Sequence, residues 1–242
     1  MPTSLVDALE ADSGVTCVVG AGGKKSTLYA LADRLERAIV TATVRIPPFA
    51  DRMAKLAVTK RPDDVVRSTE TWPLGLVPAR EGDDRYLGYE PATIDELTGH
   101  GGVPILVKAD GARTRWLKAP AENEPQLPSS ADIVVPIASV RIVGKRLGEE
   151  HVHRPERVAA VADLEVGDRI SPADVATVLT SEAGGYKDVP DGATVVPLLN
   201  MADTPELEAT AREIATEIRE RRDVPRVVVT RLLEEESIVA VV

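Results

Sequence analysis

Short apolar runs rich in valine and isoleucine alternate with amphipathic, helix-like segments along this chain. Six of these runs predict buried strands, at residues 15–19, 38–43, 104–109, 132–138, 193–199 and 226–232. Short runs that are apolar on both faces are typical of parallel strands covered by helices on both sides. The pattern therefore predicts an α/β fold with a mostly parallel sheet, helices on both of its faces, and ligands bound at the carboxyl ends of the strands.

Helix-starting residues precede several of the amphipathic segments. Thr204–Pro205 and Ser171–Pro172 each combine an N-cap side chain with a proline at the first helical position. Thr93 with Glu96 predicts a capping box, and the glycines after residue 98 would end that helix.

The stretch 74–91 has a different composition, with three glycines and two tyrosines, and predicts a hairpin or small β excursion. No repeat or low-complexity linker interrupts the chain. We therefore expect residues 1–242 to form a single domain, with a more helical C-terminal part from about residue 150.

The charge of the chain narrows the class of ligand. Its 242 residues carry a formal net charge of −10, so most of the surface repels nucleic-acid backbones and anionic membranes. A polyanionic ligand must therefore bind in a local basic pocket. The basic residues are mostly arginine among plentiful Asp and Glu, a bias that suggests adaptation to a salt-rich cytosol and predicts that added salt raises the melting temperature.

Cysteine usage and hydropathy indicate the compartment. Cys17 is the single cysteine, so the chain forms no internal disulfide, and inside an apolar run we expect it to be a buried hydrophobic residue. No apolar run approaches the ~20 residues that span a bilayer, and the first residues lack the features of a signal peptide. We expect a cytoplasmic protein with neither a membrane nor a nucleic acid as partner.

The stretch GAGGKKST, residues 20–27, stands between a predicted strand and a predicted helix. In that context glycines let backbone N–H groups turn toward an anion, and a lysine neutralises the outer phosphates. The spacing GxxxxGK[ST] is not met. Either Lys24 is the phosphate lysine of a shorter GxxGK loop, with Lys25 where a hydroxyl residue is expected, or Lys25 and Ser26 form the KS pair. The first register keeps both Gly20 and Gly23 in place and is preferred.

The alternative interpretation of this stretch is a glycine-rich turn with exposed lysines. We favour a P-loop NTPase-like fold that binds ATP or GTP with Mg²⁺. The predicted nucleotide-binding residues in this loop are Gly20, Ala21, Gly22, Gly23, Lys24, Lys25, Ser26 and Thr27.

A second group of polar residues follows the predicted strand at 104–109. Asp110 stands just past this strand, where P-loop proteins place the carboxylate that orients Mg²⁺ or its waters, and Ser26 is the candidate hydroxyl ligand of the metal. The segment after it is dense in functional groups: Arg113, Arg115, Lys118, Glu122 and Glu124. Alternatively each is a solvated loop charge, which is the preferred interpretation for Arg115, and Asp110 is only a turn-former.

Several short motifs together resemble the YqeC family. They are GAGGK after a strand, ADGA followed by a basic residue, LKAP, the EP of ENEP, and HRPE, and the matching blocks extend from about residue 15 to residue 203. The resemblance implies a P-loop accessory protein in the maturation of selenium-dependent molybdenum hydroxylases. Its implied partners are a nucleotide, a molybdopterin-type cofactor and an apo-hydroxylase.

Position by position, the loop residues and the family's motifs give a candidate site. The predicted catalytic residues are Lys24, Asp110, Lys118 and Glu124, and the predicted substrate-binding residues are Thr41, Thr43, Arg113, Lys118, Glu122, His153 and Arg154. Several positions depart from the family's pattern, among them Asn123, which stands where the family usually has histidine, and two lysines. Lys25 replaces a hydroxyl residue and Lys108 replaces an acidic residue, so this site is more basic and offers fewer ligands for a second metal ion.

Residues 198–204, LLNMADT, stand where the family commonly has NKxD, the pattern with which GTP-binding proteins recognise guanine. Asn200 would brace the loop, and Asp203 would accept hydrogen bonds from the guanine ring and its amine, while Met201 replaces the lysine. The alternative is an asparagine turn followed by an aspartate near a helix N-terminus. The choice between adenine and guanine stays open.

The motif HVHRPE contains His151 and His153, which would face the same side of a strand. With His100 as the one other histidine in the sequence, metal binding is the less favoured interpretation. His153 with Arg154 predicts an anion- or substrate-contacting corner, or the start of a helix.

The leading hypothesis is a nucleotide-dependent accessory protein that hydrolyses ATP or GTP or transfers a group from it. Two alternatives belong to other classes. One is a non-catalytic carrier or chaperone of a phosphate-bearing molybdopterin cofactor. The other is a small-metabolite kinase or ligase, which the short GxxGK loop suggests.

Overall fold

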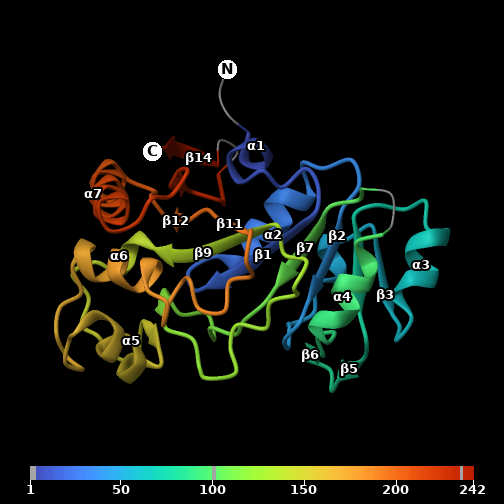
Figure 1. The fold of residues 1–242 in the computed structure, drawn as a ribbon, viewed down its shortest axis with the longest axis horizontal. Coiled ribbons are helices and arrows are strands. Elements are labelled where there is room, and N and C mark those ends of the chain that lie inside the picture. Colours follow the sequence, from blue (N-terminus) through green and yellow to red (C-terminus); the bar gives the residue numbers. More distant parts are fainter. Residues whose placement is uncertain (1–3, 100–101, 235–236) are drawn as a thin grey trace.

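The structure is a computed structural model that describes residues 4–99, 102–234 and 237–242. Its centre is a large sheet (Figure 1). The strands are β1 (Val15–Gly20), β2 (Ile39–Ala42), β3 (Lys55–Val58), β4 (Leu74–Val77), β7 (Ile105–Lys108), β9 (Ile133–Ser139), β11 (Thr194–Val195), β12 (Leu198–Asn200), β13 (Val228–Thr230) and β14 (Ile238–Val241). The order is β14-β13-β12-β9-β1-β7-β2-β4-β3, with β11 paired to β9.

The direction of the strands brings their carboxyl ends to one edge. β13 and β14 pair antiparallel, and the other strand pairs described in this sheet are parallel. The mostly parallel sheet of the predicted α/β fold is confirmed. Because β1 lies between β7 and β9, the turn after β1 is at the middle of this edge.

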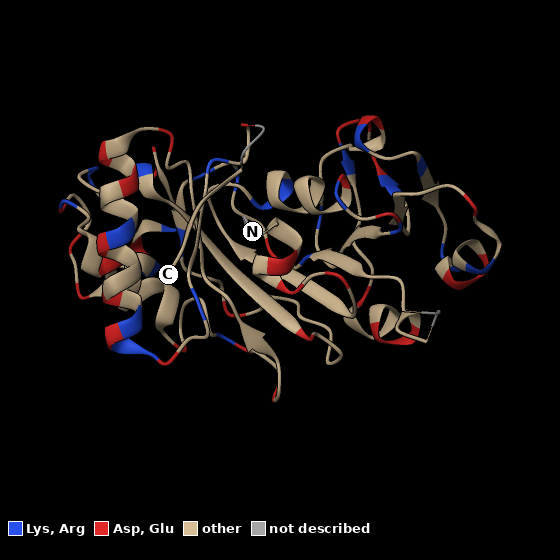
Figure 2. Cartoon of the chain, turned by 90° about the horizontal axis from the view of Figure 1, so that it is seen from above, with Lys and Arg blue, Asp and Glu red and all other residues tan. Residues whose placement is uncertain are grey.

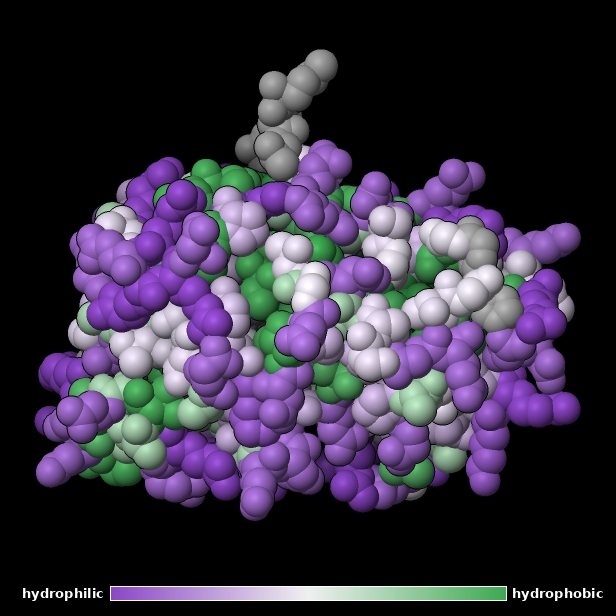
Figure 3. Space-filling view, in the orientation of Figure 1, coloured by the Kyte–Doolittle hydropathy of each residue, from purple (hydrophilic) through white to green (hydrophobic). Residues whose placement is uncertain are grey.

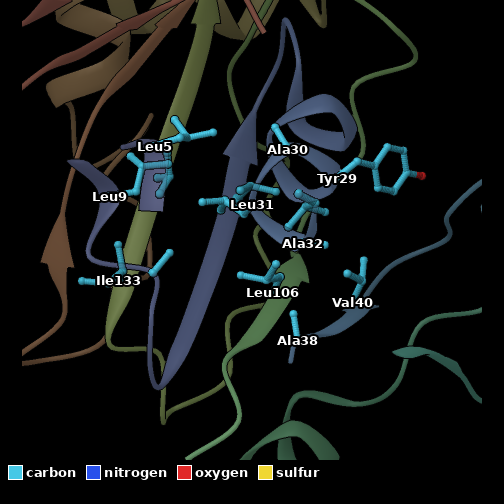
Figure 4. Packing of buried hydrophobic residues seen from close by; sticks show 14 of the residues in the cluster. Leu5, Leu9, Tyr29, Ala30, Leu31, Ala32, Ala38, Val40, Leu106 and Ile133 are labelled. Carbon is cyan, nitrogen blue, oxygen red and sulfur yellow. The ribbon is translucent and has the colours of Figure 1, made fainter. Parts of the chain in front are cut away.

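Helices cover both faces of the sheet (Figure 1). They are α1 (Leu5–Leu9), α2 (Lys24–Ala32), α3 (Pro62–Ser68), α4 (Pro91–Leu97), α5 (Pro155–Ala162), α6 (Pro172–Thr180) and α7 (Pro205–Arg221). Val18 of β1 packs with α1 and α2, as the side chains in Figure 4 illustrate for this cluster. Its neighbours Cys17 and Val19 pack on the opposite side with α4. This alternation shows why β1 is apolar on both faces.

Cys17 is fully buried, and burial raises the pKa of its thiol far above the ordinary value. A thiol in this environment is not ionised at neutral pH, so its reactivity is low. It has the buried, structural position that the apolar run predicts.

All six predicted strands are present, and one of them is divided. The run 193–199 forms β11 and β12, which pair with different parts of β9, at Ile133 and Ile137. Pro197 separates the two short strands and has no N–H to donate to a ladder. The proline therefore explains the interruption.

The expectation of a β excursion over 74–91 is wrong for its first residues. Leu74–Val77 is β4, which lies between β2 and β3 in the main sheet. Only β5 (Arg80–Glu81) and β6 (Arg85–Tyr86) form a small separate hairpin. The prediction was wrong because glycine at position 75 is typical of a turn. In the structure a Cβ on Gly75 would lie 2.6 Å from Leu56 Cδ1, so glycine is needed here for close packing.

Two of the three predicted helix starts are confirmed. The side chains of Ser171 and Thr204 accept hydrogen bonds from backbone N–H groups in the first turns of α6 and α7. The capping box at Thr93 is wrong, because α4 begins at Pro91 with Glu90 as its N-cap. The proline fixes the start of the helix, which places Thr93 inside the first turn.

The C-terminal part of the chain contains α5, α6 and α7, which share one apolar cluster. Figure 2 shows both signs of charge along the long helix α7, where Arg212 pairs with Glu208 and Arg221 with Glu217 on the helix surface. On the face drawn in Figure 3, hydrophilic residues surround the apolar ones. The division near residue 150 stays a prediction.

Among the described helices, none has the length and apolar character needed to cross a membrane.

Candidate functional site

A cleft with a volume of about 930 Å³ lies at the carboxyl edge of the sheet. Its walls come from the ends of β1, β2, β7 and β12 and from the loops that follow them. The residues lining it are Gly22–Ser26, Thr43–Pro47, Asp84, Arg85, Leu87, Gly88, Glu90, Lys108, Gly111–Arg115, Asn123, Glu124, Gln126, His153, Arg154 and Met201. This is the edge at which parallel sheets bind their ligands.

The glycine turn after β1 is held close to the end of β9. Ala21 donates its N–H to the carbonyl of Ile137 at 2.8 Å. Gly22 has a φ of 91°, and a Cβ placed on it would lie 2.4 Å from the backbone N of Ser139. Only glycine fits this position, because both the conformation and the space exclude a side chain.

The N-terminus of α2 opens onto the cleft. Gly23 is its N-cap and provides no side-chain cap, and the first turn contains no acidic residue. The first N–H groups of a helix have no partner within the helix and carry the positive end of its dipole. Lys24, Lys25 and Ser26 of this turn line the cleft. A helix end of this kind is suited to bind an anion.

An ionic cluster lies beneath the turn. Lys24 Nζ is 2.8 Å from Asp110 Oδ1 and also donates to the carbonyl of Gly20. The other carboxylate oxygen of Asp110 accepts from the N–H of Gly20 at 2.9 Å and lies 2.9 Å from Lys118 Nζ. Asp110 therefore ties the glycine turn to the neighbouring strand β7 and fixes the side chain of Lys24.

The cluster continues through Glu124. Its Oε2 lies 2.7 Å from Lys118 Nζ and 2.7 Å from Arg154 NH1. Lys118 also donates to the carbonyl of Gly111 at 2.7 Å, so its three donors have acceptors. Lys118 is in β8 (Leu117–Lys118), which pairs with β10 (Val152–His153) and so brings Arg154 within reach. The motifs ADGA, LKAP, ENEP and HRPE, far apart in sequence, meet in this one cluster.

Burial and the neighbouring charges shift the pKa values in the cluster. Burial would raise the pKa of Asp110, but Lys24 and Lys118 lower it below the usual value. Burial opposes ionisation of Glu124 as well, and Lys118 with Arg154 overcomes it and lowers the pKa to about 2. Both carboxylates are therefore ionised at neutral pH.

The pKa values of the basic groups are lowered too, which favours their neutral forms. Burial lowers the pKa of Lys24, which Asp110 only partly offsets. Burial and the charge of Lys24 lower the pKa of Lys108 to about 7. Burial, Arg154 and Lys118 lower the pKa of His153 to about 4, so its imidazole is neutral at physiological pH.

The contacts of Asp110 decide how it can serve a metal. Lys24 and Lys118 pair with its two oxygens, so Asp110 positions both lysines. Its buried Oδ1 nevertheless accepts no hydrogen bond from the described residues, and its role as the carboxylate that orients Mg²⁺ or its waters stays a prediction. Within residues 4–99, 102–234 and 237–242, no group of three or more His, Cys, Asp or Glu side chains could hold a metal ion. Ser26, on the cleft wall, fits a Mg²⁺ whose other ligands are phosphate oxygens and waters.

Comparisons with known proteins identify the family of the chain. The model of the family described as "YqeC protein" matches residues 16–156, which include the glycine turn and the ionic cluster. The chain belongs to the YqeC family. A YqeC protein of Escherichia coli (strain K12), described as uncharacterized, is 30% identical to it over 210 residues, which cover 82% of this chain and 81% of the relative. In this YqeC family member the matched segment ends at the HRPE motif, beside Arg154.

The structure separates the remaining predicted site residues into two groups. Thr43, Arg113, His153 and Arg154 line the cleft, and so does Arg115. Three others do not line it. Thr41 is buried and donates to the carbonyl of Leu76, Glu122 is exposed outside the cleft, and Thr27 donates to the carbonyl of Gly23.

The two histidines of HVHRPE have different surroundings. His151 stacks on Trp116 with ring centroids 4.4 Å apart, whereas His153 faces the cleft. Arg154 is the N-cap of α5, so this motif also starts a helix. His100 lies outside the described residues.

Asn200 braces the glycine turn of this YqeC protein. Its buried amide donates to the carbonyl of Gly22 at 2.8 Å, and its Oδ1 accepts from Thr230 Oγ1 and from the N–H of Leu232. Asp203 is ion-paired with Arg141 and does not line the cleft, whereas Met201 does. The guanine-reading role of Asp203 stays a prediction, and it requires the carboxylate to leave Arg141.

Replacing Asn200 with alanine is expected to lower the free energy of unfolding by about 2–4 kcal/mol, because two buried hydrogen bonds and one partly buried hydrogen bond are lost. Urea denaturation measures this loss. Asp203→Asn is the matched control, with an expected cost below about 1 kcal/mol for its partly exposed ion pair. Equal stability of the two variants would show that Asn200 does not brace the turn.

The ion pairs of Glu124 predict how the thermal stability of the protein changes at acid pH. Because the pKa of Glu124 is lowered to about 2 in the folded protein, its stabilising effect is full above the unfolded value near 4.5 and is lost as the pH falls toward 2. Glu124→Gln is therefore expected to melt roughly 4 °C below the parent at pH 7 and to approach it by pH 3. Thermal melts from pH 7 to 3 measure the difference, with the exposed Glu122→Gln as control. A gap that stays constant with pH would contradict the assignment.

The cleft is strongly basic for a protein of net charge −10. Eight Lys and Arg residues line it against three Asp and Glu residues. Sequence inspection missed Arg45 and Arg85, because only the sheet topology and the small hairpin bring them to the glycine turn. An excess of positive charge in a concave site favours a polyanionic ligand.

Proposed function

We propose that this YqeC protein binds ATP or GTP at the N-terminus of α2 and acts in the cytoplasm in the maturation of selenium- and molybdenum-cofactor hydroxylases, with hydrolysis of the nucleotide or transfer from it. One observation supports nucleotide binding above all. The uncapped end of α2, with a glycine turn and two lysines, opens onto a basic cleft. The family's motifs suggest the pathway.

Each residue of the turn would make a different contact to the phosphates. The N–H groups of Gly23, Lys24 and Lys25 point from the end of α2, and the half-buried Lys25 is free to follow the outer phosphates. Asp110 holds Lys24 at the base of the turn, which removes the cost of ordering that long side chain on binding. Mg²⁺, when bound, would neutralise phosphate charge, with Ser26 as the chain's hydroxyl ligand. In this chemistry the protein positions groups and stabilises charge.

A specific observation also favours the non-catalytic alternative, a carrier of a phosphate-bearing molybdopterin cofactor. Glu124 is ion-paired with two cations, and His153 has a pKa near 4. Neither is a strong base at neutral pH, so activation of a water molecule by these groups is weak. Measured release of phosphate or pyrophosphate separates the two functions, since a carrier releases neither.

A thermal-shift panel of ATP, GTP, CTP and molybdopterin nucleotides, with and without Mg²⁺, tests the proposal. A ligand at 100 times its dissociation constant stabilises a protein by about 2.7 kcal/mol. We expect ATP or GTP to raise the melting temperature more than CTP does. No shift with any nucleotide would overturn the proposal, and a shift with molybdopterin nucleotides alone would favour the carrier.

A further inference from the structure

The loop between β7 and β8 makes a tight turn at its tip. The N–H of Arg115 donates to the carbonyl of Ala112 at 2.9 Å, and the two residues between them, Arg113 and Thr114, have φ values of 47° and 59°. Positive φ at both central positions is the pattern of a type I′ turn, in which Asn and Gly are the usual residues. Arginine and the β-branched threonine adopt it only at a cost in conformational energy. The turn is therefore strained.

Left-handed backbone of this kind is concentrated at the cleft. The structure shows positive φ for seven non-glycine residues, and two of them, Glu10 and Asp163, are helix C-caps, where this conformation is common. Four of the others line the cleft, namely Arg113, Thr114, Arg154 and Met201. Strain that gathers at one site indicates a functional constraint on the residues that carry it.

Both ends of the loop are attached to residues that contact the glycine turn. Before the tip, Asp110 accepts a hydrogen bond from the N–H of Gly20 at 2.9 Å. After the tip, the carbonyl of Trp116 accepts from the N–H of Ser139 at 2.9 Å, and this same nitrogen would lie 2.4 Å from a Cβ on Gly22. The loop thus spans from the end of β7 to the end of β9, and β1 lies between these strands. Its tip therefore stands beside the glycine turn.

The two sides of the loop are fixed, whereas its tip is open. The carbonyl of Gly111 accepts from Lys118 Nζ at 2.7 Å, and the N–H of Trp116 donates to the carbonyl of His151 at 2.8 Å. The two tip residues are exposed and line the cleft. A turn held in this way fixes the direction in which the side chain of its first central residue leaves the backbone.

The guanidinium of Arg113 is available to a ligand. Lys118 and Arg154 are paired with Glu124, but among the residues that the structure describes no carboxylate pairs with Arg113. The positive charge of Arg113 contributes to the lowered pKa of His153, so the guanidinium lies near that wall of the cleft. A guanidinium has five donors in a fixed geometry that matches the oxygens of a phosphate group.

We propose that the strained Ala112–Arg115 turn presents Arg113 to the outermost phosphate of the bound nucleotide, and that Thr114 is a positioning residue for this contact. The inference rests on the proposed nucleotide binding. The glycine turn and the end of α2 would hold the phosphates through backbone N–H groups, and the neighbouring loop would add a cation to the phosphoryl group farthest from the base. P-loop enzymes stabilise charge on a transferred phosphoryl group with an arginine provided in this way. The contact makes the site selective for a triphosphate over a diphosphate.

Isothermal titration calorimetry with the β,γ-imido analogue of ATP or GTP and with the matching diphosphate tests the role of Arg113. We expect Arg113→Asn, which tolerates positive φ, to weaken binding of the analogue by about tenfold or more and binding of the diphosphate by less than about threefold. Arg115→Asn is the matched control, because it removes the same charge from the same loop outside the strained pair. It is expected to change either affinity by less than about threefold.

Two substitutions of Thr114 test the positioning role. Thr114→Asn keeps the turn at a lower conformational cost, so it should raise the melting temperature by roughly 2 °C and bind the analogue like the parent. Thr114→Pro fixes φ at about −65°, which this turn excludes, and should weaken the analogue as much as Arg113→Asn does. A purely structural turn would change the melting temperature and leave the ratio of analogue to diphosphate affinity unchanged.

The possible failures are distinguishable. Parental affinity of Arg113→Asn for the analogue, or equal weakening of analogue and diphosphate, would overturn the role of Arg113. Parental analogue binding by a folded Thr114→Pro variant would overturn the role of Thr114. Absence of analogue binding by the parent protein would overturn the proposed function, and this inference with it.

Discussion

Replacing Lys118 with methionine is expected to lower the free energy of unfolding by about 3–5 kcal/mol, the cost of breaking a buried ion pair by removing one partner. Lys118 is 1% exposed, and its ammonium contacts Asp110, Glu124 and the carbonyl of Gly111. The variant leaves each carboxylate with a single cation in a buried place. Urea denaturation followed by circular dichroism measures the effect.

The control for Lys118→Met is Lys60→Met, which removes the same charge from an exposed position. It is expected to change the free energy of unfolding by less than about 0.5 kcal/mol. If Lys118→Met changed the free energy of unfolding as little as Lys60→Met does, the ionic cluster would not stabilise the fold.

Replacing Lys24 with methionine is expected to weaken binding of MgATP and MgGTP by about 30- to 150-fold, or 2–3 kcal/mol, the loss of one charge-assisted contact to phosphate. Lys25→Met should weaken it by less, about tenfold or below, because Lys25 is only half-buried and its charge is better screened. Isothermal titration calorimetry measures both affinities at a temperature at which each variant is folded.

Parental affinity in the Lys24→Met, Lys25→Met double variant would show that the glycine turn does not bind the phosphates. The opposite order, with Lys25 the more important, would place the phosphate lysine in the KS register. Lys24 would then be only the anchor that Asp110 holds beneath the turn.

Much of the fold follows from local patterns in the sequence. β1, β7 and β9 are buried runs of valine and isoleucine, and such runs have few structures other than a strand inside a parallel sheet. β3 and β14 lie at the edges of the sheet and are half-exposed, so they lack that continuous apolar signal. β4 was missed because Gly75 has the appearance of a turn.

The candidate site was predictable where its residues are contiguous and not where the tertiary fold assembles it. The glycine turn and its lysines are neighbours in sequence and precede a helix, so their chemistry is visible without coordinates. The pairing of Asp110 with two lysines depends on contacts between β7, β8 and the turn. For that reason the sequence suggested only a role toward Mg²⁺, which stays a prediction, and did not reveal the ion pairs by which Asp110 positions two lysines.

The central claim is that nucleotide phosphates bind at the turn between β1 and α2, and hydrogen exchange measured by mass spectrometry tests it most directly. Addition of saturating MgATP or MgGTP is predicted to slow exchange of the backbone N–H groups in peptides covering residues 20–27, and less in peptides from α7. Unchanged exchange at residues 20–27 under conditions where the nucleotide binds would contradict the account.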